Sequence, residues 1–188
     1  HQKGATVVMA CRSPRKAEAT RQQLLEMHGE GALDLVDLDL ADLANVSRCS
    51  DAIHQRYGRL DLLINNAGVM APPYQRSRQG HELQFAVNHL GHMALTQALL
   101  PLLKRDARVV TVTSGAQYFG RIRWNDLSWQ ERYDRFGAYS QSKLANVMFA
   151  LELDARLKQS GSGISSLAAP RGMARTNLQR SNLTAESN

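Results

Sequence analysis

The sequence predicts an α/β fold: a doubly wound parallel sheet with helices on both faces. Short apolar stretches typical of strands alternate with longer stretches whose apolar residues recur every three or four positions. The chain has 188 residues, of which 43% are hydrophobic and 21% charged, and it contains no low-complexity run. This length and composition fit one globular domain, to which we assign residues 1–188. Alternating strands and helices favour a parallel sheet covered on both sides.

The first half of the chain is predicted to follow the order β-α-β-α-β. Three strands are expected at residues 6–10, 33–37 and 60–64, and two helices at residues 14–28 and 43–57. The third strand leads directly into Asn65-Asn66-Ala67-Gly68.

The second half continues the alternation. Leu83, Val87, Leu90, Ala94 and Ala98 recur at helical spacing, which predicts one long helix over residues 80–103 with one buried face. Pro101 is expected to bend or end this helix. A strand at 109–112, a long helix at 138–158 and a strand at 164–168 follow.

The net charge of +6 does not predict a nucleic-acid partner, because the basic residues are dispersed and no aromatic-interleaved basic patch occurs. The charge suits either a positive funnel for an anionic cofactor or a merely solvated basic surface. Cys11 and Cys49 lack the spacing of metal ligands or of a disulfide framework, so we expect reduced thiols and no metal site. No apolar run reaches the roughly 18 residues of a membrane span, so the default expectation is a soluble, cytoplasmic protein.

Polar residues gather where the predicted strands end. Ligands of such sheets lie beyond the carboxyl ends of the strands, and Asn65, Ser114 and Gly172 all follow strands. Tyr139 and Lys143 are four residues apart near the start of a helix, so they share one face. That face can look into the same crevice.

These residue types suit the reduction of a carbonyl. A phenol has a pKa of about 10, and an adjacent ammonium lowers it by ~1 to 3 units, so Lys143 would tune Tyr139 for proton exchange. Ser114 could hydrogen-bond the substrate oxygen, and Asn88 could hold a water that links Lys143 to solvent. Taken singly, the four residues have ordinary alternatives: a packing tyrosine, a solvated lysine, a strand-end cap and a polar helix kink.

Several motifs together resemble the short-chain dehydrogenase/reductase family, in its retinol-dehydrogenase-like branch. They are Asp39-Leu40, Asn65-Asn66-Ala67-Gly68, Asn88-His89-Leu90-Gly91-His92, Val112-Thr113-Ser114, Tyr139 to Lys143, and Thr176-Asn177-Leu178. The resemblance covers nearly the whole chain. It implies a Rossmann-type fold, hydride transfer between a nicotinamide cofactor and an alcohol or carbonyl, and a catalytic tetrad of Asn88, Ser114, Tyr139 and Lys143.

The resemblance also implies cofactor contacts. Asp39 and Leu40 would contact the adenine, and the cofactor cleft would be lined by Asn66, Ala67 and Gly68. The nicotinamide ribose would be bound by Lys143, next to Tyr139. Gly172 and Thr176 would lie beside the nicotinamide. It further implies that the aromatic residues between Ser114 and Tyr139 border the substrate entrance. It suggests a dimer or tetramer formed through long helices, but the apolar faces near Leu90 and Phe149 could equally be buried in the domain's own core.

Cofactor choice follows from the residues after the first visible strand. An acidic residue there would pair with a free ribose 2′-hydroxyl, and Cys11-Arg12-Ser13 stands instead. This favours NADP(H) over NAD(H), with Arg12 and either Arg15 or Lys16 receiving the 2′-phosphate. The alternative is that these are ordinary exposed residues at a helix start.

The sequence departs from the family pattern in two places. No glycine-rich turn is visible near the start. In the family this turn follows a central strand, so we expect that strand to be missing between the strands near Val7 and Leu63. Its absence would leave two buried edges unpaired and the chain marginally stable. Arg171 stands where the family usually has proline, before Gly172. A catalytically silent fragment or interaction module without a working cofactor site is therefore the alternative function, and the substrate's identity stays open.

Overall fold

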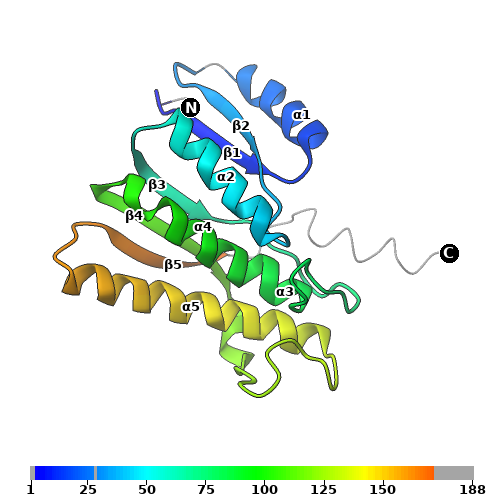
Figure 1. Ribbon diagram of the computed structural model, residues 1–188. Coiled ribbons are helices and arrows are strands. Elements are labelled where there is room, and N and C mark those ends of the chain that lie inside the picture. Colours follow the sequence, from blue (N-terminus) through cyan, green and yellow to red (C-terminus); the bar gives the residue numbers. More distant parts are fainter. Residues whose placement is uncertain (1–2, 28, 172–188) are drawn as a thin grey trace.

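The computed structural model describes residues 3–27 and 29–171. Its helices and strands follow one another in the order shown in Figure 1. They are β1 (Val7–Cys11), α1 (Pro14–Leu25), β2 (Leu33–Asp37), α2 (Leu43–Arg56), β3 (Leu60–Asn65), α3 (Leu83–Phe85), η1 (Ala86–Leu90), α4 (Gly91–Leu99), η2 (Leu100–Leu102), β4 (Leu103–Ser114), η3 (Gly115–Phe119), α5 (Arg135–Gln159) and β5 (Ser165–Arg171). The predicted α/β alternation is confirmed.

The strands form two parallel sheets. β1 pairs with β2, and β3, β4 and β5 pair in that order, so that Ile64, Val110 and Leu167 are register neighbours. Among the described strands, none pairs with the second edge of β1 or of β3. The expectation that these two strands lack a shared neighbour is therefore confirmed, and Figure 1 shows the two sheets as separate groups.

A layer of helices holds the two sheets together. α2, α4 and α5 run side by side across one side of the sheets (Figure 1). The main core cluster joins buried side chains of β2, α2 and α4, and Leu60 and Leu63 of β3 pack against its edge. Burying an aliphatic side chain contributes roughly 1.5–3 kcal/mol, so this shared core is the main connection between the sheets.

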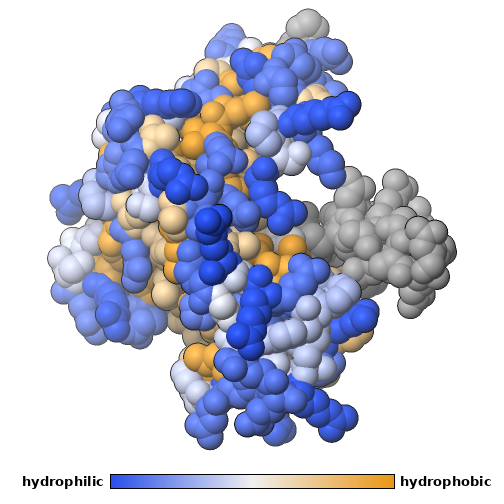
Figure 2. All heavy atoms as spheres, turned by 45° about the vertical axis from the view of Figure 1, so that its right-hand side comes forward, coloured by the Kyte–Doolittle hydropathy of each residue, from blue (hydrophilic) through white to orange (hydrophobic). Residues whose placement is uncertain are grey.

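The opposite side of the three-stranded sheet is open in the described part of the chain. Side chains alternate along a strand, so Leu62 and Ile64 face away from the helices that contact Leu63. Leu62, Ile64 and Leu167 keep 50%, 55% and 48% of their surface exposed. Figure 2 shows hydrophobic surface open to view between hydrophilic margins on the face that it presents.

The prediction of a single helix over residues 80–103 is wrong. Gly80 has a φ of +85°, which belongs to the left-handed region, and the helix begins only after Glu82, whose carboxylate accepts the amides of Gln84 and Phe85. The segment Ala86–Leu90 is a π-helix, and Pro101 lies in a final 3-10 turn. Apolar spacing alone could not reveal these changes of helix type.

The other boundaries differ less. α1 ends at Leu25 rather than at residue 28, and β4 is longer than predicted because it begins at Leu103. α5 begins three residues earlier than predicted, since the Asp134 side chain accepts the amides of Phe136 and Gly137 and caps the helix.

Candidate active site

The loops after β3 and β4 lie at the same end of the three-stranded sheet, because these strands are parallel. Beyond β3, Asn66 and Ala67 are exposed and Gly68 is partly buried. Beyond β4, Ser114 is partly buried, and its hydroxyl oxygen accepts the amide of Ala116 at 3.3 Å. The expected convergence is present for the ends of β3 and β4, whereas Gly172 lies outside the described residues.

Asn88 is fully buried and is held in the widened turn of the π-helix η1. Its Oδ1 accepts the amide of Val69 at 2.8 Å, and its Nδ2 donates to the carbonyl of Val69 at 3.0 Å and to Ser142 Oγ at 2.9 Å. Both amide hydrogens of Asn88 are therefore used, and Oδ1 keeps one lone pair. The side chain ties the loop after β3 to helix α5.

Tyr139 and Lys143 lie one turn apart near the start of α5, as predicted, and both are buried. The ammonium nitrogen of Lys143 lies 5.7 Å from the centre of the Tyr139 ring and donates to the carbonyl of Val112 at 3.3 Å. The positive charge is thus beside the phenol. Val112 lies two residues before Ser114, the last residue of β4. This bond therefore holds the end of β4 against the start of α5.

Gly68 is the point where the predicted groups meet. A Cβ atom at this position would lie 3.1 Å from Asn88 Oδ1 and 3.6 Å from Lys143 Nζ. A side chain here would therefore crowd Asn88 Oδ1 and touch Lys143 Nζ. The absence of a side chain at Gly68 therefore lets the loop after β3 approach Asn88 and Lys143 closely, next to the exposed residues Asn66 and Ala67.

Ser114 reaches the cluster through its neighbour. Thr113 Oγ1 donates to the carbonyl of Lys143 at 3.0 Å, which fixes the end of β4 against α5. Gly120 packs so closely on the carbonyl of Ser140 that an added Cβ would lie 2.5 Å away. The structure thus brings Asn88, Tyr139 and Lys143 into one cluster and places Ser114 at its border.

Two further residues of the cluster were missed by sequence reasoning. Ser142 Oγ donates to the carbonyl of Tyr139 at 2.7 Å while it accepts from Asn88. His92 Nδ1 lies 3.0 Å from the carbonyl of Asn88, and burial, with smaller contributions from Lys143 and His89, lowers the pKa of His92 to about 4. His92 is therefore neutral near pH 7. A signal for it was available, because His92 follows Asn88 at a spacing of four.

The predicted adenine side of the site is ordered by local contacts. Asp39 Oδ1 accepts the amide of Ala41 at 2.9 Å, and the Asp39 amide donates to Asn45 Oδ1 at 2.6 Å. Leu40 is buried against Gly91, where an added Cβ would lie 2.6 Å from the Leu40 carbonyl oxygen. The segment that follows β2 therefore lies directly against the start of α4.

The remaining predicted cofactor residues divide into two groups. Arg12, Arg15 and Lys16 are exposed where β1 passes into α1. Gly172 and Thr176 lie outside the described residues, so the structure does not place them.

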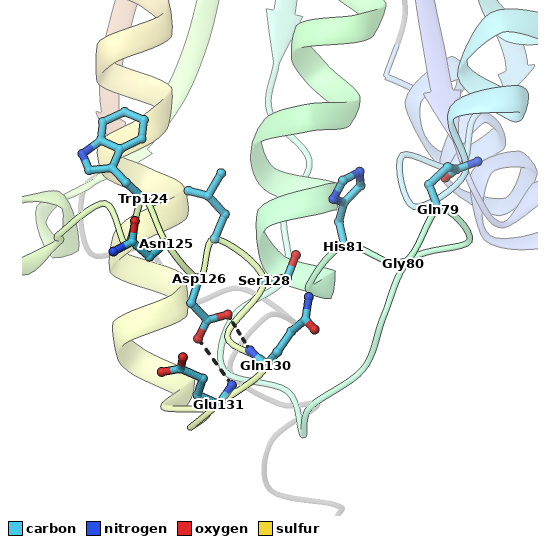
Figure 3. Close-up of a pocket in the computed structure, with 10 residues that line it drawn as sticks. Gln79, Gly80, His81, Trp124, Asn125, Asp126, Ser128, Gln130 and Glu131 are labelled. Atoms are coloured by element: carbon cyan, nitrogen blue, oxygen red, sulfur yellow. Dashed lines mark hydrogen bonds between the residues drawn. The ribbon is translucent and has the colours of Figure 1, made fainter.

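The loop between Ser114 and Tyr139 carries exposed aromatic side chains, with Phe119 84% and Trp124 72% exposed. Part of this loop borders an open hollow of about 580 Å³, which Figure 3 shows between residues 79–81 and residues 124–131. The hollow is lined by polar side chains, including His81 and Glu131, and by none of the four predicted catalytic residues. It is separate from the cluster around Lys143.

Among residues 3–27 and 29–171, no group of three or more His, Cys, Asp or Glu side chains is arranged to hold a metal ion. None of the helices in this part of the chain has the length and apolar character needed to cross a membrane.

Comparison with known proteins gives a consistent result. The family model for short chain dehydrogenases matches residues 1–187. Retinol dehydrogenase 14 of Mus musculus is 42% identical over 189 residues, which cover 94% of this chain and 56% of the mouse protein. The chain thus spans a little over half the length of this curated relative.

Solved structures agree with this assignment. An uncharacterised protein from Mycobacterium paratuberculosis superposes with a TM-score of 0.82 at 48% identity, covering 94% of this chain and 62% of that one. RhlG of Pseudomonas aeruginosa, solved as an NADP active-site complex, gives a TM-score of 0.73 at 25% identity, covering 96% of this chain and 68% of that one. With the fold and these matches together, the chain belongs to the short-chain dehydrogenase family of oxidoreductases, in its retinol-dehydrogenase-like branch.

Proposed function

We propose that the protein containing this chain transfers a hydride between NADP(H) and an alcohol or carbonyl substrate, using Asn88, Ser114, Tyr139 and Lys143. The observation that carries the proposal is the buried cluster below Gly68, in which the Lys143 ammonium lies 5.7 Å from the Tyr139 ring and Asn88 ties both neighbouring segments together. Membership of an oxidoreductase family supports the reaction class.

Tyr139 is the proton-transfer group of this proposal. Its hydroxyl gives a proton to the carbonyl oxygen during reduction, and the resulting phenolate takes a proton from the alcohol during oxidation. The Lys143 ammonium lies beside the phenol ring and can interact with the charge that changes there during proton transfer. Burial of Lys143 strengthens this interaction, because water does not screen it fully.

Ser114 and Asn88 have supporting roles. The Ser114 hydroxyl is fixed at the border of the cluster and can donate to the substrate oxygen as negative charge develops there. Asn88 is the proposed relay residue; its side chain is fully buried and spans from Val69 to Ser142, which fixes its position beside Lys143.

The nicotinamide cofactor, when bound, supplies or accepts the hydride. Asn66 and Ala67 are exposed, and Gly68, which follows them, lies beside Lys143, so this segment can line a bound cofactor. Exposed Arg12 can receive a 2′-phosphate through charge-assisted hydrogen bonds, which supports NADP(H).

The catalytic assignment is tested by Tyr139→Phe in the complete protein, assayed with NADPH and a panel of carbonyl substrates. Removal of the hydroxyl is expected to lower kcat by roughly 10²–10⁴-fold with the circular dichroism spectrum unchanged. Tyr57→Phe is the matched control, because it removes a phenol that bonds Asp34 outside this cluster. Undiminished turnover in Tyr139→Phe would refute the assignment.

Cofactor choice is tested by fluorescence titration with NADPH and NADH. Arg12→Gln is expected to weaken NADPH binding about tenfold and leave NADH binding unchanged, since only NADPH carries the 2′-phosphate. Arg59→Gln removes another exposed arginine and serves as control. Failure of the complete protein to bind either cofactor would favour the alternative function, a catalytically silent interaction module.

A further inference from the structure

Gln84 is a fully buried amide one helical turn before Asn88. Its Oε1 accepts the amide of Ala71 at 2.8 Å, and its Nε2 donates to Tyr133 Oη at 2.9 Å and to the carbonyl of Arg135 at 2.9 Å. Both amide hydrogens are used. A buried glutamine with three directed bonds is a rigid connector, because losing any partner would leave a buried polar group unpaired.

Gln84 and Asn88 form similar connections at successive turns. Each accepts an amide from the loop after β3, from Ala71 and Val69 respectively. Each also donates to α5 or its first residue, at Ser142 for Asn88 and at Arg135 for Gln84. The loop that follows the proposed cofactor segment and the helix that carries Tyr139 are therefore joined at two levels.

The Ala71 end of this connection holds an unfavourable backbone conformation. Ala71 has a φ of +51°, in the left-handed region that a residue with a Cβ rarely adopts. Such a conformation persists when surrounding contacts over-determine it. The bond from the Ala71 amide to Gln84 is one of those contacts, so Gln84 fixes the path of the loop beyond Gly68.

The Arg135 end lies directly below Tyr139. In an α-helix the amide of residue i pairs with the carbonyl of residue i−4, so the Arg135 carbonyl belongs to the backbone pair of Tyr139. Gln84 Nε2 donates to that same carbonyl. The first turn of α5 is thereby held at a set position relative to the Ala71 loop.

We propose that Gln84 is a positioning residue for Tyr139: it sets the distance between the phenol and the cofactor loop by bonding Ala71 and Arg135 at once. The inference rests on the proposed oxidoreductase function and gives a role to a residue outside the four proposed catalytic groups. A misplacement of about 1 Å at a reacting group can lower turnover about 10²-fold. Loss of the Gln84 amide is expected to act in this way.

The test compares Gln84→Met with Gln141→Met in the complete protein. Gln141 is equally buried, and it bonds the Arg123 amide and the Leu127 carbonyl at 3.0 Å each, in the outer loop. Both variants are expected to lose thermal stability to a similar degree. Gln84→Met is expected to lower kcat 10- to 100-fold while the NADPH dissociation constant stays within about threefold, and Gln141→Met to keep kcat.

A second variant keeps the test decisive if Gln84→Met does not fold. Gln84→Glu retains the shape and the acceptor for Ala71 but loses the donor to Arg135 when it is ionised. Its kcat is expected to fall, and to recover relative to wild type as the pH is lowered and the carboxyl regains a proton. A kcat for either variant that falls no further than that of Gln141→Met would overturn the positioning role.

The failure of this inference differs from failure of the proposed function. An active wild-type protein, an inactive Tyr139→Phe and a fully active Gln84→Met would reject only the role of Gln84. Full turnover by Tyr139→Phe would reject the proposed catalytic function itself.

Discussion

The buried imidazole of His92 makes folding stability depend on pH in a predictable direction. Its exposed fraction is 3%, and burial is the largest cause that lowers its pKa from 6.5 to about 4. In the unfolded chain His92 takes up a proton below pH 6.5, whereas in the folded chain it does so only near pH 4. The stability that neutral His92 contributes is therefore present above pH 6.5 and is lost as the pH falls towards 4.

The size of the effect follows from the two pKa values. At about 1.4 kcal/mol per pKa unit, the interval from 6.5 to about 4 corresponds to about 3 kcal/mol. This is a large part of the ~5–15 kcal/mol that stabilises a typical domain. We expect urea unfolding curves of the wild type to show this loss between pH 7 and pH 4, in addition to the contributions of other groups.

The comparison with His92→Gln isolates this one contribution. Glutamine keeps a polar side chain near the Asn88 carbonyl but has no proton to take up, so the wild type should lose about 3 kcal/mol relative to this variant from pH 7 to pH 4. His54→Gln, which removes an exposed imidazole, is the control. A parallel pH dependence of wild type and His92→Gln, or an NMR titration of His92 with a midpoint near 6.5, would refute the reasoning.

Two further predictions concern packing and thiol reactivity. Gly91→Ala should lower the free energy of unfolding in urea by about 3 kcal/mol, because its Cβ would lie 2.6 Å from the Leu40 carbonyl oxygen. Gly58→Ala is the control and should lower it by less than about 0.5 kcal/mol, because nothing lies within 4 Å of the added Cβ. Equal effects of the two substitutions would contradict the close approach at Gly91. Burial, with a smaller effect of Asp37, raises the pKa of the Cys49 thiol to about 11. Iodoacetamide should therefore modify Cys49 at pH 8 at least 100-fold more slowly in the native protein than in urea. Equal rates in the native and the denatured protein would contradict the raised pKa.

Much of the fold could be predicted from the sequence because short-range patterns encode it. The strand at residues 33–37 has the predicted bounds, and the helices at 14–25 and 43–56 begin where predicted. Pro14 and Asp42 favour these starts, since proline suits the first helical turn and the Asp42 side chain accepts the Ala44 amide. The alternation of apolar and polar residues and the helix-capping side chains act over a few neighbouring residues, so the sequence alone indicates them.

The sequence was less informative where several elements determine one conformation. The π-turn at Ala86–Leu90 brings Asn88 to Val69 and Ser142, and its apolar spacing resembles that of an ordinary α-helix. The bonds of Gln84 reach Ala71 and Arg135, which are 13 and 51 residues away along the chain. Such partners meet only after the helices have packed.

The sequence by itself determined the alternation of strands and helices, the family, and the residue types of the proposed site. The motif from Tyr139 to Lys143 predicts that both side chains share a helix face, because a spacing of four residues requires it. Only the tertiary structure decided that Lys143 lies 5.7 Å from the Tyr139 ring, and that Gly68 lies next to Asn88 and Lys143. The physical reason is that helix and strand periodicities are local, whereas distances across the site depend on how separate elements pack around a shared core.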